Sequence, residues 1–249
     1  MINVTTETLV LVLGIIVLAT LVRSAFGFGD ALVGMPLLAL VIPLRTATPL
    51  MAFVGPTVGL LMLARTWRRV DLRSVGVLAA STLAGIPVGL FVLTRLPERP
   101  VAVVLAAFII LVAVHSLFRP ALIRLRSSRS APLFGFVAGI LGAAFNTNGP
   151  PVALYGAWRG WTSEAFRATV QGYFLLTGPM ILLGQGAAGL WTGEVGRAYL
   201  LALPLMAGAV AVGLKLGRRI PEARFHGWVY GLLLAAGVLL LLKTLTSAG

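Results

Sequence analysis

The sequence predicts an all-α polytopic membrane protein built from two inverted structural repeats. Composition, the spacing of apolar segments and residues that recur at a fixed distance all point to it. Of the 249 residues, 59% are hydrophobic and only 11% are charged. A soluble domain carries about 25% charged residues. A chain with so little charge cannot cover itself with a water-facing surface, and we expect it to lie in a lipid bilayer.

Residues of uncommon types recur along the chain. Pairs that lie 124 positions apart are Trp67 and Trp191, Gly89 and Gly213, and Pro97–Glu98 and Pro221–Glu222. The pair Gly55–Pro56 recurs as Gly178–Pro179 at a slightly smaller distance. Internal repeats of this kind are typical of secondary transporters. We expect two repeats, residues 1–125 and 126–249, within one membrane domain.

Apolar segments alternate with short polar gaps. They fall at 8–25, 30–44, 46–64, 74–94, 101–118, 132–145, 151–158, 168–190, 198–214 and 227–245. Segments of about 20 residues can cross the hydrocarbon layer. Two pairs are predicted to be too short, 8–25 with 30–44 and 132–145 with 151–158, and the breaks between them read GFGD and NTNGPP. Each repeat is predicted to be a broken, re-entrant hairpin followed by three transmembrane helices.

The basic residues predict the orientation of these segments. The net charge is +13, and Arg and Lys concentrate in the gaps 65–73, 119–129 and 215–224. Cytoplasmic loops of membrane proteins carry such an excess, which explains the charge without nucleic acid as a partner. With these gaps inside, the second hairpin leaves from the cytoplasmic side and returns to it, whereas the first starts and ends outside. The second repeat is then inverted relative to the first.

The inverted arrangement predicts where the two breaks lie. The hydrocarbon layer holds no water that could satisfy backbone N–H and C=O groups, so unwound peptide there must face protein or a wet cavity. We expect GFGD and NTNGPP to approach each other from opposite faces and to line one central cavity.

Several stretches, taken in order, resemble the signatures of the TauE/SafE family of sulfite and organosulfonate exporters. They are GFGDALVGMPLLAL, RTWRRVDLR, GIPVGLFVLTRLPERP, GFVAGILGAAFNTNGPPVALYG, FRATVQGYF and GLKLGRRIPEARF. The resemblance covers nearly the whole chain. It implies an integral membrane transporter of small sulfur-containing anions or carboxylates. The chain departs from the family where Gly29–Asp30 stands in place of a denser glycine run, and where NTNGPP replaces a commoner glycine-rich version.

The second break offers a predicted anion site. Asn146, Thr147, Asn148 and Gly149 combine helix-capping side chains with a glycine that permits close backbone approach. A short helix that starts near Pro151 would direct free amides and a partial positive charge into the break. The alternative interpretation is that these residues only cap and turn a re-entrant loop.

The first break is its counterpart. Gly27 and Gly29 permit contact with a ligand or with the other hairpin, or they pack helices together. Asp30 is a carboxylate well inside an apolar region, where burial disfavours its charged form. It is the candidate for proton coupling, with a helix cap as the alternative. Three interpretations of Arg23 are open: it binds an oxyanion, it pairs with Asp30, or its side chain extends to the outer surface.

Gln171 and Tyr155 are further predicted substrate-binding residues, and Thr48, Thr177 and Gln185 are secondary candidates. We expect neither catalytic residues nor a metal or cofactor. The chain has no cysteine, no two histidines at a ligand-like spacing, no Ser/His/Asp set and no ATP-binding loop. An enzyme is therefore not predicted.

These observations predict a multi-pass secondary transporter of the inner (cytoplasmic) membrane. It would export sulfite, an organosulfonate or a related small organic anion by alternating access. The alternatives are an anion channel or facilitator with the same cavity, and a membrane enzyme or assembly subunit of sulfur metabolism. The expected partners are the small anionic substrate and the lipid bilayer, and the oligomeric state is left open between monomer and homodimer.

Overall fold

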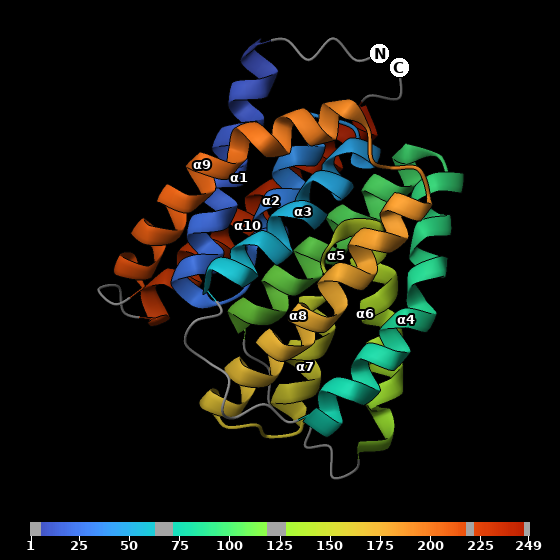
Figure 1. Ribbon diagram of the computed structural model, residues 1–249, viewed down its shortest axis with the longest axis vertical. Coiled ribbons are helices and arrows are strands. Elements are labelled where there is room, and N and C mark those ends of the chain that lie inside the picture. Colours follow the sequence, from blue (N-terminus) through green and yellow to red (C-terminus); the bar gives the residue numbers. More distant parts are fainter. Residues whose placement is uncertain (1–5, 63–71, 119–127, 218–221, 247–249) are drawn as a thin grey trace.

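A computed structural model describes residues 6–62, 72–118, 128–217 and 222–246, which are helical with short connections (Figure 1). The helices are α1 (Thr6–Phe26), α2 (Asp30–Ala39), α3 (Leu44–Met62), α4 (Leu72–Arg95), α5 (Glu98–Phe118), α6 (Ala131–Phe145), α7 (Gly149–Trp158), α8 (Ser163–Ala187), α9 (Gly193–Leu216) and α10 (Glu222–Thr246). A 3₁₀ turn, Ser128–Ser130, precedes α6. Each apolar segment of the sequence corresponds to one helix, and the predicted all-α membrane class is confirmed.

The lengths of the helices correct one expectation. We expected 8–25 to be too short to cross, but α1 has 21 residues. Within the described residues, five helices are long and apolar enough to cross a membrane, namely α1, α4, α5, α9 and α10. The second arms of the hairpins, α2 and α7, have only 10 residues each. At about 1.5 Å per residue they span roughly 15 Å, or half of the ~30 Å hydrocarbon layer.

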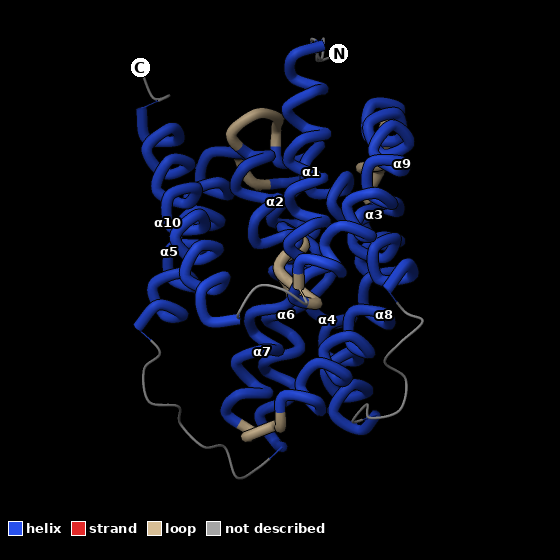
Figure 2. Tube along the Cα trace, turned by 90° about the vertical axis from the view of Figure 1, so that its left-hand side faces the viewer, coloured by secondary structure: helices blue, strands red, loops and turns tan. Residues whose placement is uncertain are grey.

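The two hairpins point in opposite directions. The α1–α2 hairpin opens toward the end of the molecule where the termini lie, and the α6–α7 hairpin opens toward the other end (Figures 1 and 2). Their breaks meet near the middle of the molecule (Figure 2). The inverted repeat and the cytoplasmic side remain predictions. Trp67, Pro221 and most of the basic gaps 65–73 and 119–129 lie outside the described residues.

Each hairpin packs mainly against the other half of the chain. The first arm α6 lies along α4, and the first arm α1 lies along α9. In the same way α5 pairs with α10, and α3 pairs with α8. Each of these pairs joins one helix from residues 1–125 to one from residues 126–249. The two halves therefore pack closely against each other, and their assignment to a single membrane domain stays a prediction.

Glycines allow this close packing. A Cβ on Gly89 of α4 would lie 2.3 Å from the Ile140 carbonyl oxygen of α6, and a Cβ on Gly213 of α9 would lie 2.7 Å from Cβ of Ser24 in α1. Both distances are too short for a side chain. The fourth helix of each half is α4 in the first and α9 in the second. Gly89 and Gly213 thus mark the places where these helices contact the hairpin of the other half.

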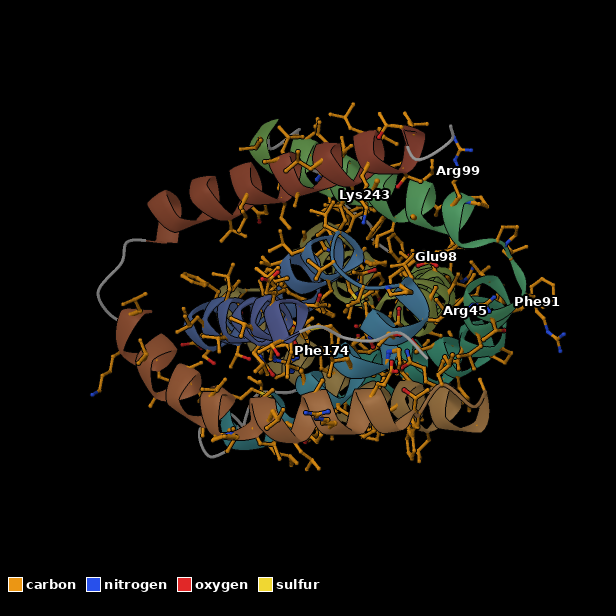
Figure 3. The ribbon with its side chains drawn as sticks, turned by 90° about the horizontal axis from the view of Figure 1, so that it is seen from above. Arg45, Phe91, Glu98, Arg99, Phe174 and Lys243 are labelled. Carbon is orange, nitrogen blue, oxygen red and sulfur yellow. The ribbon has the colours of Figure 1, made fainter. Side chains whose placement is uncertain are left out.

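Charged side chains hold the helix ends at the end of the molecule that carries the termini (Figure 3). Glu98 Oε1 accepts a hydrogen bond from the Leu44 amide at 2.7 Å, which satisfies the first turn of α3. Arg45 Nη2 donates to the Thr94 carbonyl of α4 at 2.6 Å, and Arg99 Nε donates to the Thr244 carbonyl of α10 at 3.1 Å. These contacts tie the start of α3 to the end of α4 and the start of α5, and the start of α5 to the end of α10.

The α4–α6 contact gives a first prediction. A Cβ on Gly139 would lie 2.2 Å from the Thr82 carbonyl oxygen, so Gly139→Val should force the helices apart and destabilise the protein by about 1–3 kcal/mol or more. Tryptophan fluorescence during heating in detergent should show a melting temperature lower by roughly several degrees. Gly76→Ala in α4 is the matched control, because a Cβ there meets nothing within 4 Å. Equal melting temperatures for the two variants would contradict the prediction.

Candidate functional site

The two breaks line one pocket in the centre of the molecule. Its lining residues are Arg23, Phe28, Gly29, Asp30, Ala31 and Leu32 at the first break, Asn146, Thr147, Asn148, Gly149 and Pro150 at the second, Met51, Ala52, Gly55 and Pro56 on α3, and Phe174, Gly178 and Ile181 on α8. Six of the predicted site residues at the breaks therefore share this pocket with Arg23.

The breaks have the same length and begin in the same way, but their last residues differ, since Gly29 is left-handed and Asn148 is right-handed. Each is three residues long, between α1 and α2 in the first half and between α6 and α7 in the second. Each begins with a residue in the left-handed conformation, Gly27 with φ 87° and Asn146 with φ 54°. Glycine adopts this conformation without strain, and asparagine is among the residues that tolerate it best. A left-handed residue ends the helix and turns the chain back.

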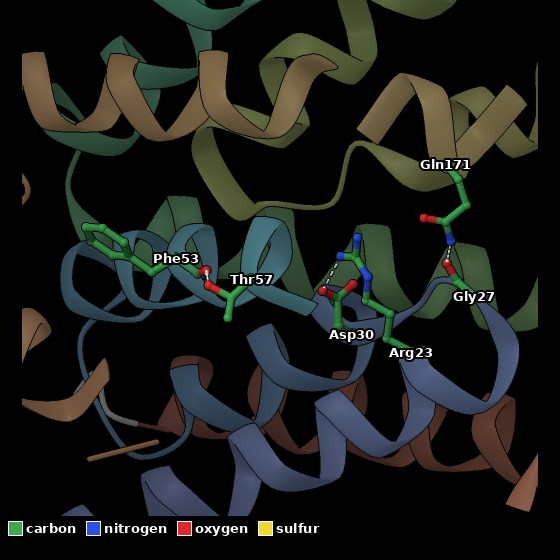
Figure 4. A network of polar contacts seen from close by, with 6 residues as sticks. All are labelled: Arg23, Gly27, Asp30, Phe53, Thr57 and Gln171. Carbon is green, nitrogen blue, oxygen red and sulfur yellow. Dashed lines mark hydrogen bonds and ion pairs between the residues drawn. The ribbon is translucent and has the colours of Figure 1, made fainter. Parts of the chain in front are cut away.

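The third helix of the opposite half holds each break. The Gln171 side chain of α8 donates a hydrogen bond to the Gly27 carbonyl (Figure 4), and the Asn146 side chain donates to the Thr48 carbonyl of α3. Thr48 and Gln171 lie 123 positions apart, as Gly55–Pro56 and Gly178–Pro179 do. A Cβ on Gly178 would lie 3.2 Å from Cγ of Pro56, so the two Gly–Pro pairs meet where α3 and α8 touch.

Carbonyl groups near the end of α6 also have partners. The Thr48 hydroxyl donates to the Ala144 carbonyl at 3.0 Å, and Gln185 Nε2 donates to the Ala143 carbonyl at 3.1 Å. Both side chains are fully buried. These secondary candidates from the sequence therefore support the second break from α3 and α8.

Asn148 belongs to a buried polar chain behind the pocket. Its Nδ2 donates to Thr177 Oγ1 at 3.3 Å, and Thr177 Oγ1 donates to the Tyr173 carbonyl at 2.8 Å. The Tyr173 hydroxyl lies 2.7 Å from Thr82 Oγ1 of α4. A hydrogen-bonded chain fixes its members in place. The Asn148 amide is therefore held at the wall of the pocket.

The start of α7 differs from the expectation. The helix begins at Gly149 rather than near Pro151. Pro150 and Pro151 consequently occupy its first turn, and proline has no N–H to offer. The first turn of α2 has no proline, and Gly29, Asp30, Ala31 and Leu32 all line the pocket. Since the first amides of a helix have no partner within it, α2 supplies more amides to the pocket than α7 does.

Arg23 and Asp30 form a buried ion pair at the pocket (Figure 4). Arg23 Nη1 lies 2.6 Å from Asp30 Oδ2. The guanidinium carbon lies 5.5 Å from the centre of the Phe174 ring, which favours a cation. Arg23 therefore pairs with Asp30 inside the protein and does not extend to the outer surface.

Three predicted residues lie elsewhere. Gly27 and Gln171 bond to each other beside the pocket but do not line it. Tyr155 is fully buried in a separate cluster, where its ring contacts Phe134 and Trp161. The structure does not bring Tyr155 to the pocket.

Sequence reasoning missed Phe174 and did not assign Gly55, Pro56 and Gly178 to the site. The recurring Gly–Pro pairs were a usable signal, because they mark the crossing of α3 and α8. For Phe174 there was none, since one aromatic residue in an apolar segment is unremarkable.

Broken helices that bring an ion pair and asparagine side chains together at a central pocket of an apolar helical fold are typical of one class, the membrane transporters. Residues 12–240 match the family model Sulfite exporter TauE/SafE, so the chain belongs to this family of membrane transporters. The resemblance noted in the sequence is confirmed. Neither the curated proteins nor the solved structures gave a match.

The ion pair gives a second prediction. Removing one partner of a buried pair leaves an uncompensated charge, which typically costs about 3–5 kcal/mol. Asp30→Ala should therefore lower the melting temperature clearly, and Arg23→Met combined with Asp30→Ala should recover part of the loss because no charge remains. Heating the wild type, Asp30→Ala, Arg23→Met and the double variant in detergent measures this. A double variant whose loss equals the sum of the two single losses would show that the charges do not compensate each other.

Proposed function

We propose that this protein is a secondary transporter of the inner membrane that exports sulfite, an organosulfonate or a related small organic anion. Membership of the TauE/SafE family supports a sulfur-compound transporter. The observation that carries the proposal is the pocket shared by the two breaks. Such a pocket is where discontinuous helices of transporters bind their substrate.

The chemistry of the pocket suits a small anion. The first turn of α2 directs amides and the positive end of its dipole toward the pocket. Asn148 adds a side-chain amide, and Arg23 adds a guanidinium. The cavity has a volume of about 50 Å³, counted as the space that the centre of a water molecule can occupy. One water needs roughly 10–15 Å³ on this measure, so the site holds a few waters or one small anion.

In our proposal, transport follows from rocking of the helix pairs around this pocket. The α1–α2 hairpin reaches it from one end and the α6–α7 hairpin from the other. Moving one hairpin away from the helices beside it would expose the pocket to one side of the membrane at a time. An inside-negative membrane potential expels an anion with about 2.3 kcal/mol per charge per 100 mV, so export needs no ATP.

A third prediction concerns the second break. Asn148→Ala and Asn146→Ala should each lower sulfite flux in proteoliposomes by roughly 5- to 150-fold, because losing a hydrogen-bonding partner in a buried site costs about 1–3 kcal/mol. The amount of folded protein should stay the same. Ser81→Ala is the control, since Ser81 is half-buried outside the pocket lining and its hydroxyl donates within its own helix, to the Val77 carbonyl. Wild-type flux in both asparagine variants would remove the proposed site.

A fourth prediction concerns proton coupling by Asp30. If the carboxylate takes up a coupling proton, wild-type flux depends on pH and Asp30→Asn flux does not, because an amide cannot ionise. Flux measured over a series of pH values tests this. Glu98→Gln, which neutralises a carboxylate outside the pocket, should keep the wild-type profile. An unchanged profile in Asp30→Asn would exclude Asp30 as the coupling group.

A further inference from the structure

The hydrogen bonding of Arg23 is incomplete. A guanidinium has five N–H donors, and the structure shows one bond, from Nη1 to Asp30 Oδ2 at 2.6 Å. Nε is buried and has no hydrogen-bond partner in the part of the chain that the structure describes. A buried donor without a partner is costly, yet Arg23 is only 5% exposed and lines the pocket.

Besides the bond to Asp30, packing holds the guanidinium in place. The Phe174 ring lies 5.5 Å from its central carbon. On α3, a Cβ on Gly55 would lie 3.5 Å from Nη1, and a Cβ on Gly59 would lie 3.4 Å from Nη2. The flat group therefore lies close against α3 at both glycines. Arg23 is held in place with donors still available.

The charges at the pocket cancel. Among the lining residues that the structure describes, Arg23 is the one cation and Asp30 the one anion. An anion that enters while the pair is closed finds no net positive charge. The carboxylate of Asp30 has the same chemistry as an oxyanion substrate, two oxygens that share a negative charge. It accepts the hydrogen bond from Nη1 of Arg23, a donor that such a substrate would need.

We propose that Asp30 is a built-in competitor of the substrate. It neutralises Arg23 while the pocket is empty, and it is displaced when an oxyanion binds Arg23 through two of its N–H groups. This inference rests on the proposed function, since it concerns how the same pocket selects and holds its anion.

The inference narrows the class of substrate. A guanidinium prefers anions with two oxygens at the spacing of its fork, such as sulfite, sulfonates and carboxylates. A halide has no such pair of oxygens and gains less when it displaces the carboxylate. The Asp30 carboxylate therefore weakens the binding of simple anions more than that of oxyanions, and the pocket is selective for oxyanions.

Two variants of the purified full chain test the inference. Asp30→Asn keeps the shape of the side chain and removes the competing charge, so sulfite and methanesulfonate should bind at least roughly tenfold more tightly by calorimetry. The affinity for chloride should increase much less. Arg23→Gln combined with Asp30→Asn leaves no buried charge at the pocket, and this double variant should not show the increase in affinity. Glu98→Gln and the exposed Arg197→Gln are matched controls that should bind as the wild type does.

The outcomes separate this inference from the proposed function. If the wild type binds and transports these anions but Asp30→Asn binds them no more tightly, Asp30 is not a competitor and the transporter stands. An equal gain for chloride contradicts selection of oxyanions, and a gain retained in the double variant excludes Arg23 as the ligand. If the wild type neither binds nor transports them, the proposed function fails and the inference fails with it.

Discussion

The arrangement of this protein depends on how unwound backbone is satisfied inside a membrane. Two helical hairpins stop in the middle of the molecule, where the lipid offers no water to their carbonyl and amide groups. Partners come from the opposite half of the chain, with Gln171 bonded to the first break and Thr48 to the second. The breaks can exist only where α3 and α8 reach them, so satisfying the backbone also brings the two breaks together.

Glycine packing makes that meeting sterically possible. Close contact of α4 with α6 and of α1 with α9 draws each hairpin into the other half, and Gly89 and Gly213 mark equivalent places in the two contacts. The pocket between the hairpins is then small. A buried arginine is stable there because Asp30 neutralises it and Phe174 covers it.

Much of the fold could be predicted from the sequence. Long apolar runs interrupted by GFGD and NTNGPP predict the helices and both breaks, since hydropathy and breaker residues are local properties. The length of α1 was underestimated, because Thr6 and Glu7 are polar and were left out of the apolar segment 8–25, yet they form the first turn of the helix. The start of α7 at Gly149 and the position of Tyr155 also depend on neighbours that are distant in sequence. Of the site, the residues at the breaks were predictable and Phe174 was not.

The opposite entry of the two hairpins is the central claim, and sided labelling tests it most directly. The chain has no natural cysteine, so single cysteines can be placed at Arg129, Thr162 and Leu96. The first two flank the α6–α7 hairpin, and Leu96 lies beside Glu98, which contacts Leu44 at the end where α2 finishes. We predict that a membrane-impermeant thiol reagent modifies the cysteines at 129 and 162 from one side and the cysteine at 96 from the other. Modification of 129 and 162 from different sides would contradict the account.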